Sequence, residues 1–268
     1  MRICTLALGA VLSVSACLAG GAVGCTSGDD NAVNALAKEA GVDANIGPVG
    51  ANESKQNGRI VDAIDKFGVA GATVTVGGKT ALTRDDGTYE IVVPRSTPYT
   101  MSVAEPAHYK LNEQEWIIKE ATFDRKDTSL LSVDIANLLA SFLPVRDPAK
   151  GLLVVRIFPV PPCDSEQGST LAIEPAGTSK LTYFSGARPN KAATSTTKDE
   201  AFSGAFSDVD INVPIKVIVT SPSCEAVAFP VDYQGVTYTG VQKTEPGEVL
   251  SYVRVFIGPK KIADAGSD

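Results

Sequence analysis

The sequence contains one histidine, so any catalytic arrangement that needs an imidazole depends on His108. His108 lies in Glu105-Pro106-Ala107-His108-Tyr109, a stretch typical of a surface turn. A serine hydrolase would also need a nucleophile on a G-x-S-x-G turn, and the sequence contains no such motif. A zinc site of the usual kind needs several His or Cys ligands. We therefore expect His108 to be a turn residue and the chain not to be an enzyme.

The carboxylates suggest one metal site, for calcium. Asp85-Asp86-Gly87 and Glu90 could supply the hard oxygen ligands that Ca²⁺ prefers. The D-x-D-x-D spacing of calcium loops is missing, however, and an Asp-Gly hairpin turn explains the same residues. The paired acids of a glycosidase are set by tertiary geometry and cannot be read from spacing. We expect neither a metal ion nor a cofactor.

Exposed aromatic rings would indicate a carbohydrate-binding surface, because sugar rings stack on aromatic faces. The candidates are Tyr109 and Trp116, the latter in the strand-like run Gln114-Glu115-Trp116-Ile117-Ile118. A single tryptophan in such a run is more often a core residue. The exposure of Trp116 therefore separates a carbohydrate-binding module from other functions. The sequence itself leaves the ligand unknown.

Residues 1–24 are typical of a cleaved export signal. Arg2 supplies a positive charge, residues 3–24 contain no charged side chain, and the polar stretch Thr26-Ser27-Gly28-Asp29-Asp30 follows. An uncleaved transmembrane anchor is the alternative that this length allows.

Two cysteines in this leader are candidates for lipid attachment. Ala22-Val23-Gly24-Cys25 resembles the bacterial lipobox, in which the cysteine is diacylated and becomes the mature N-terminus. Val14-Ser15-Ala16-Cys17 is a second match, but cleavage there would leave apolar Leu18–Gly24 on the mature chain. The resemblance implies a lipid anchor on Cys25, with an ordinary secretory signal as the alternative. Thr26 after the anchor, by the sorting rules of such lipoproteins, implies the outer membrane.

Of the five cysteines, the two that lie beyond residue 25, Cys163 and Cys224, are expected to form a disulfide. Export places them in an oxidising compartment, and lipidation of Cys25 would remove the only other thiol of the mature chain. The bond would close a loop of about 60 residues, worth about 4 kcal/mol in the chain-entropy model. Two separate buried thiols are the alternative.

Composition and charge narrow the possible partners. Hydrophobic residues make up 44% of the 268, which is enough for a packed core. Lys and Arg number 24 against 31 Asp and Glu, a net charge of −7 with no basic run. Nucleic-acid binding needs clustered cations, so we exclude it.

The polar stretch 25–55 is expected to be a flexible tether, and short strands begin after it. Two hairpin turns, Gly77-Gly78 and Asp86-Gly87, separate strands of alternating pattern. The strands expected in this region are Arg59–Ala63, Gly71–Val76, Lys79–Thr83, Tyr89–Val93 and Tyr99–Val103. Strands at this spacing predict a small antiparallel sandwich. Its expected core residues are Ile60, Val74, Val76, Ile91 and Val103.

Residues 56–110 also resemble a known family, the carboxypeptidase regulatory-like domain. The resemblance rests on Gly58–Asp62, Val69–Val74, Thr83–Tyr89 and Val93-Pro94, which fall in order at the expected spacing, although His108-Tyr109 stands where Gly-Tyr is common. It implies a transthyretin-like (prealbumin-like) sandwich. The resemblance implies no activity. The family resembles an accessory domain of carboxypeptidases, and this accessory domain lacks the zinc site of the peptidase.

The rest of the chain predicts a connecting segment and a second module. Residues 111–150 include a helical pattern over Ser129–Leu143 with Ser132 as its cap. Residues 151–258 read as a second β-sandwich, with its first strand, Leu152–Ile157, paired to its last, Leu250–Ile257. Residues 259–268 are expected to be a disordered tail.

Together these features predict an all-β chain of two small antiparallel β-sandwich modules in tandem, with a short connecting helix. The expected function is that of a membrane-anchored, non-catalytic envelope lipoprotein that displays the modules for structural or protein-interaction roles. A carbohydrate-binding surface module is the alternative. The expected partners are the membrane, through the lipid anchor, and an unknown envelope protein or polysaccharide.

Replacing the predicted anchor cysteine tests whether the protein is attached to the membrane by a lipid. Cys25→Ser should abolish labelling by a fatty-acid probe and release the protein to the soluble fraction, because no acyl chain would remain to hold it. Cys17→Ser is the matched control and should leave the label in place. Label that survives Cys25→Ser but disappears in Cys17→Ser would move the anchor to Cys17.

Overall fold

The computed structural model describes residues 49–140, 145–186, 188–198 and 202–260. The predicted signal peptide, most of the tether, and the tail beyond residue 260 lie outside these ranges. Cys17 and Cys25 therefore also lie outside the described residues. No helix in the described ranges is long and apolar enough to cross a membrane.

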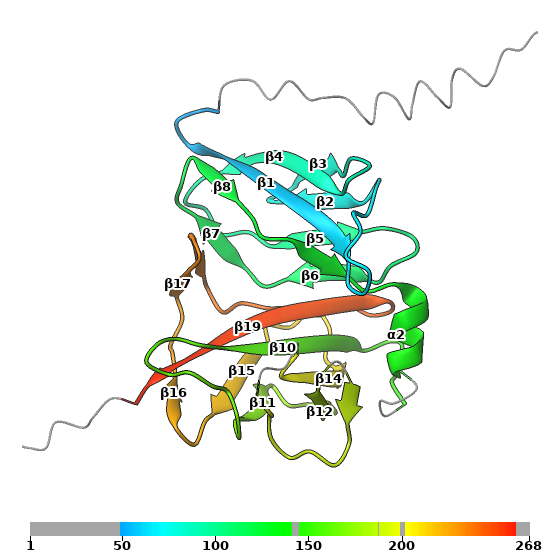
Figure 1. Cartoon of the computed structure of the whole chain (residues 1–268), viewed down its shortest axis with the longest axis vertical. Helices are drawn as coiled ribbons and strands as arrows, with labels where there is room; N and C mark the ends of the chain where they lie inside the picture. Colours follow the sequence, from blue (N-terminus) through cyan, green and yellow to red (C-terminus); the bar gives the residue numbers. More distant parts are fainter. Residues whose placement is uncertain (1–48, 141–144, 187, 199–201, 261–268) are drawn as a thin grey trace, which may run out of the picture. The chain divides into compact units, whose positions relative to one another are not determined.

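The described chain is all-β with one short helix, as the sequence predicts (Figure 1). The strands of the first half are β1 (Glu53–Asp62), β2 (Thr73–Val76), β3 (Lys79–Leu82), β4 (Thr88–Pro94), β5 (Met101–Ala104), β6 (Lys110–Glu113), β7 (Trp116–Ile118), β8 (Thr122–Asp124) and β9 (Thr128–Leu130). Helix α2 (Val133–Ala140) follows. The strands of the second half are β10 (Gly151–Pro159), β11 (Thr170–Glu174), β12 (Lys180–Ser185), β13 (Arg188–Asn190), β14 (Gly204–Val209), β15 (Lys216–Thr220), β16 (Cys224–Ala226), β17 (Val231–Tyr233), β18 (Val236–Tyr238) and β19 (Val249–Pro259).

The first sandwich consists of two layers. In one layer β1 pairs antiparallel with β4 and parallel with β8 and β9. The other layer contains β3, β2, β5 and β6, which form one end of a ten-stranded sheet. The apolar side chains alternate along each strand, so that every second one points between the layers. The five predicted core residues are confirmed, since none is more than 4% exposed: Ile60, Val74, Val76, Ile91 and Val103.

The ten-stranded sheet continues from the first region into the second. β6 pairs in parallel with β19, which pairs in parallel with β10 and lies beside it in Figure 1. The predicted pairing of the first and last strands of 151–258 is thus confirmed, with Leu152 opposite Leu250. The boundaries 56–110 and 151–258 stay predictions. The structure adds that strands of both regions share one sheet.

Strand β19 contributes to two separate cores. Phe256 packs with Trp116 and Tyr89 in the core of the first sandwich. Val253, Val255 and Ile257 point the opposite way, into a second core beneath the β11–β15 pair. Since side chains alternate along a strand, one strand can fill both cores only by being apolar on both faces.

Helix α2 begins later than the sequence predicts, and residues 141–143 of the predicted helix lie outside the described residues. Residues Thr128–Leu130 form β9 rather than the start of the helix, because they pair in parallel with Ile60–Asp62 of β1. Ser132 is next to the first helical residue, and its carbonyl accepts a hydrogen bond from Ala136 N at 2.9 Å. Leu138 is 57% exposed, so the helix buries only part of its predicted apolar face.

The Asp86-Gly87 turn is confirmed, and it packs against the end of β1. Gly87 has φ of +80° and donates to Arg84 O at 2.8 Å, while its own carbonyl accepts from Ile60 N at 2.8 Å. A Cβ at this position would collide with the carbonyl oxygen of Ile60. The turn therefore needs glycine both for its conformation and for the space it leaves.

Two glycine substitutions separate these effects. Gly78 has φ of +77° but open space around it, so Gly78→Ala should cost only the backbone strain, roughly 1 kcal/mol. Gly87→Ala should cost about 3 kcal/mol, because the collision adds to the strain. Chemical denaturation measures both, and equal losses would show that the contact with Ile60 does not matter.

Candidate functional site

The histidine lies in the turn between β5 and β6 but is largely buried, with an 11% exposed side chain. Its Nδ1 is 2.5 Å from Glu105 Oε2, and its Nε2 is 3.2 Å from Asp62 Oδ2. In a hydrolytic triad one ring nitrogen faces a carboxylate and the other faces the nucleophile. Here carboxylates occupy both nitrogens, so His108 has no nitrogen left to activate a nucleophile.

The side-chain contacts of His108 join two segments, the end of β1 and the turn between β5 and β6. Burial raises the pKa of Asp62, but hydrogen bonds from the backbone N–H groups of Ile64 and Asp65, together with His108, outweigh it and lower that pKa overall. Asp62 is therefore an anion at neutral pH. It ends β1, while His108 lies in the turn whose Ala107 carbonyl accepts from Val133 N at the start of α2. We call Asp62, Glu105 and His108 the histidine clamp.

The clamp borders a loop that presents apolar side chains to solvent. This loop comprises residues 63–68 and is named here the apolar loop. Within it, Ile64 is 62% exposed and Phe67 is 72% exposed. The backbone is nevertheless well bonded: Ile64 N donates to Asp62 Oδ1 at 2.6 Å, and Phe67 N donates to Asp65 Oδ1 at 2.8 Å. Sequence reasoning placed Ile64 and Phe67 between strands without assigning them a role. Their exposure on a braced loop marks a candidate interaction site, since exposed apolar side chains are a feature of protein-binding surfaces.

The acidic turn that could have bound calcium is explained by protein contacts. Asp86 Oδ1 accepts hydrogen bonds from Thr88 N at 2.9 Å and Thr88 Oγ1 at 2.7 Å, and these bonds lower the pKa of Asp86. Glu90 pairs with Lys55 at 3.2 Å. Within the described ranges, no cluster of three or more His, Cys, Asp or Glu side chains is arranged to hold a metal ion.

The tryptophan and the tyrosines, all of which the structure describes, do not form an exposed platform for a sugar ring. Trp116 is fully buried and Tyr109 is 7% exposed, and none of the seven tyrosines, all of them described, is an exposed residue. The Trp116 ring contacts Tyr99 edge-on, with centroids 5.1 Å apart, and the Arg125 guanidinium lies 5.0 Å from its centre. Trp116 is thus a core residue, the more frequent outcome for a single tryptophan in a strand.

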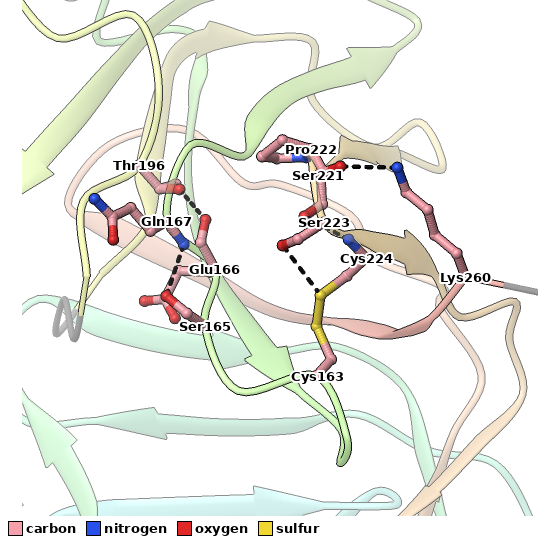
Figure 2. The surroundings of a disulfide bond; sticks show 10 residues. All are labelled: Cys163, Ser165, Glu166, Gln167, Thr196, Ser221, Pro222, Ser223, Cys224 and Lys260. Carbon is pink, nitrogen blue, oxygen red and sulfur yellow. Dashed lines mark hydrogen bonds between the residues drawn. A yellow bond between two sulfur atoms is a disulfide. The ribbon is translucent and has the colours of Figure 1, made fainter.

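The predicted disulfide between Cys163 and Cys224 is present, with Cα atoms 6.2 Å apart (Figure 2). Both cysteines are at most 7% exposed and belong to the second core. Cys163 follows β10, and Cys224 begins β16, which pairs with the end of β19. The bond therefore joins the two loops at one end of this core.

A buried cluster of charges was not predicted from the sequence. Glu113 of β6 is 3% exposed and pairs with Arg125 and with Arg254 of β19, the latter at 3.4 Å. Arg254 also lies over the rings of Tyr238 and Tyr252, at 5.5 and 4.7 Å. No sequence signal could join these residues, which lie up to 141 positions apart.

The electrostatics of this charge cluster suit structure rather than catalysis. Burial would raise the pKa of Glu113, but the two guanidinium groups outweigh burial and lower it to about 2. A general base for neutral pH needs a pKa near 7 and access to substrate. Glu113 has neither, so its carboxylate serves to join β6, β19 and the segment that contains Arg125.

Comparisons with known proteins identify no family. No protein-family model matches the sequence, and no curated protein matches it. Solved structures with some likeness include the Bacillus anthracis TIE protein, at 13% identity and a TM-score of 0.24, covering 76% of this chain and 34% of that one. The Streptococcal ancillary pilin has 10% identity and a TM-score of 0.24, covering 77% and 63%. The shaft pilin SpaA from Lactobacillus rhamnosus GG has 10% sequence identity and a TM-score of 0.21, and the match covers 79% of this chain and 98% of that one.

Removing the Glu113 charge should be costly. Glu113→Gln leaves two buried guanidinium groups without their counter-ion, so we expect a loss of about 3–5 kcal/mol in urea denaturation. Glu90→Gln breaks the half-exposed pair with Lys55 and should cost less than about 1 kcal/mol. Similar losses in the two variants would contradict a structural role for the charge cluster.

The same cluster predicts acid sensitivity. The folded pKa of Glu113 lies below the ordinary value of 4.5, so its contribution is complete above that value and is lost as pH falls from about 4.5 towards 2. The urea midpoint of the native protein should decline over this window. Glu113→Gln should decline less steeply there, and parallel pH profiles would contradict the assignment.

The disulfide makes a separate prediction. The native protein should show no alkylatable thiol at Cys163 or Cys224 under denaturing, non-reducing conditions. Replacing both by alanine should lower the free energy of unfolding by up to about 4 kcal/mol, because the unfolded chain gains the freedom of the opened loop. Free thiols at both positions would refute the bond.

Proposed function

We propose that the chain is a lipid-anchored, non-catalytic envelope protein that uses its apolar loop to bind another protein. The lipid on Cys25 holds the protein at the outer membrane, and the stretch 25–52 before β1 gives the folded part its reach. The partner offers an apolar recess for Ile64 and Phe67. The protein's own contribution is a rigid presentation of this loop.

The observation that carries the proposal is the exposure of Phe67. A phenylalanine with 72% of its surface in water contributes little to folding, because most of its ring stays hydrated. Yet the loop around it is held by Asp62 and Asp65, and Asp62 is held in turn by His108. An ordered backbone with an exposed ring lowers the entropy lost on binding, which favours recognition of a protein surface.

Two further features support the non-catalytic part of the proposal. Both nitrogens of His108 face carboxylates, and Glu113 is enclosed and fully ionised at neutral pH. His108 therefore has no ring nitrogen free to face a nucleophile, and Glu113 has neither access to substrate nor the pKa near 7 that a general base needs. The lipobox-like sequence at Cys25 supports the anchored part.

Site-specific cross-linking tests the binding site. A photo-reactive phenylalanine analogue at position 67, in cells that produce the protein, should yield a discrete adduct with one other protein. The same analogue at Ile218, which is 40% exposed on β15, is the control and should not yield it. The difference arises because only the apolar loop contacts the partner.

A substitution completes the test. Phe67→Ser should abolish co-purification of the cross-linked partner while leaving the melting temperature nearly unchanged, since the ring packs little against this protein. The proposal fails if positions 67 and 218 give the same adducts, or if Phe67→Ser leaves the association intact.

A further inference from the structure

A hollow of about 310 Å³ lies beside the disulfide, near the C-terminal end of β10. Among the described residues the ladder between β14 and β10 ends at Val155, and at the edge of β10 beyond it Ile157 N donates to Ser203 Oγ at 2.8 Å. The turn that contains Cys163, Asp164 and Glu166 borders this edge, and the three line the hollow with Arg156 and Phe158 of β10. The hollow is within the size range of small-ligand sites.

The segment that forms one wall of the hollow is held by a disulfide and by hydrogen bonds (Figure 2). The disulfide to Cys224 fixes its first residue. The carbonyl oxygen of Glu166 accepts hydrogen bonds from the Thr196 hydroxyl and, at 3.0 Å, from Ser169 N. Thr196 is itself 2% exposed. The hollow is therefore preformed rather than shaped by a ligand.

The charges that line the hollow are opposite and do not touch one another. Arg156 lies over the Phe158 ring at 5.0 Å and, among the described residues, forms no ion pair. Glu166 is 6% exposed, and within the described ranges its carboxylate has no hydrogen bond or ion pair. Both side chains line the hollow, so a ligand bound there can pair with each charge.

We propose that the hollow binds a small zwitterion, a free α-amino acid. Its ammonium group donates to the carboxylates of Glu166 and Asp164, and its carboxylate accepts from the Arg156 guanidinium. An ammonium has three donors and suits two carboxylates, while a guanidinium suits a carboxylate in bidentate geometry. A ligand with both charges satisfies both walls, whereas a ligand with one charge leaves the other wall unpaired. This site is independent of the apolar loop.

Ligand-observed NMR with charge-deleted analogues tests the proposal on the detergent-solubilised full chain. L-Alanine should give saturation transfer that excess unlabelled glycine competes away. N-Acetyl-L-alanine lacks the ammonium and L-alaninamide lacks the carboxylate, so each should bind at least fivefold more weakly. Equal signals from the three compounds, or no signal from L-alanine at millimolar concentration, would overturn the proposal without any variant.

Substitutions then assign the two walls. Glu166→Gln and Arg156→Gln should each weaken L-alanine binding at least fivefold. Glu174→Gln on β11 removes an exposed carboxylate elsewhere and should leave binding unchanged. Arg156→Gln should also reduce the preference for L-alanine over L-alaninamide, which general damage to the fold would not do. Unaltered L-alanine binding in both wall variants would refute the site.

Discussion

The pairing of β19 with both β6 and β10 is the constraint on which the rest of the fold depends. It joins strands from the two halves of the chain in one sheet and gives β19 a core on each face. Phe256 fills one core and Val255 the other, so neither core is complete without this strand. The apolar side chains of Val253, Val255, Phe256 and Ile257 suit that position, since both faces of the strand are buried. Arg254 is the charged exception in β19, and it is paired with Glu113.

The charge cluster lies where this constraint is strongest. Glu113 is the last residue of β6, and Arg254 is central in β19, so their ion pair spans the strand pair that joins the two halves. Arg125 adds a third segment and stacks on Trp116. Burying three charges costs more than burying apolar side chains of similar size, so the gain is one of specificity: only the correct alignment of these segments pairs all three.

The two sites that we propose for binding are both held by strong local bonds. The histidine clamp uses the only imidazole to hold the base of the apolar loop, and the disulfide holds the wall of the hollow beside β10. At the apolar loop these bonds lie beside the exposed side chains of Ile64 and Phe67. At the hollow they lie beside Arg156 and Glu166, which form no ion pair among the described residues. Such rigidity lowers the entropic cost of binding, and for this reason we assign the two sites to recognition.

The sequence by itself determined the local elements and one covalent link. Alternating residues such as Val74, Val76 and Ile91 predicted strands and their buried faces, because side-chain period is a property of the strand alone. Asp86-Gly87 predicted a turn because glycine adopts a positive φ without steric strain. Cys163 and Cys224 are the two cysteines beyond residue 25, so only one disulfide could be formed between them. The pairing of β19 with β6, the contact of His108 with Asp62 and the ion pair of Glu113 with Arg254 were decided only by the tertiary structure. The two side-chain contacts join residues 46 and 141 positions apart, and which strands and charges meet over such distances depends on how whole layers pack.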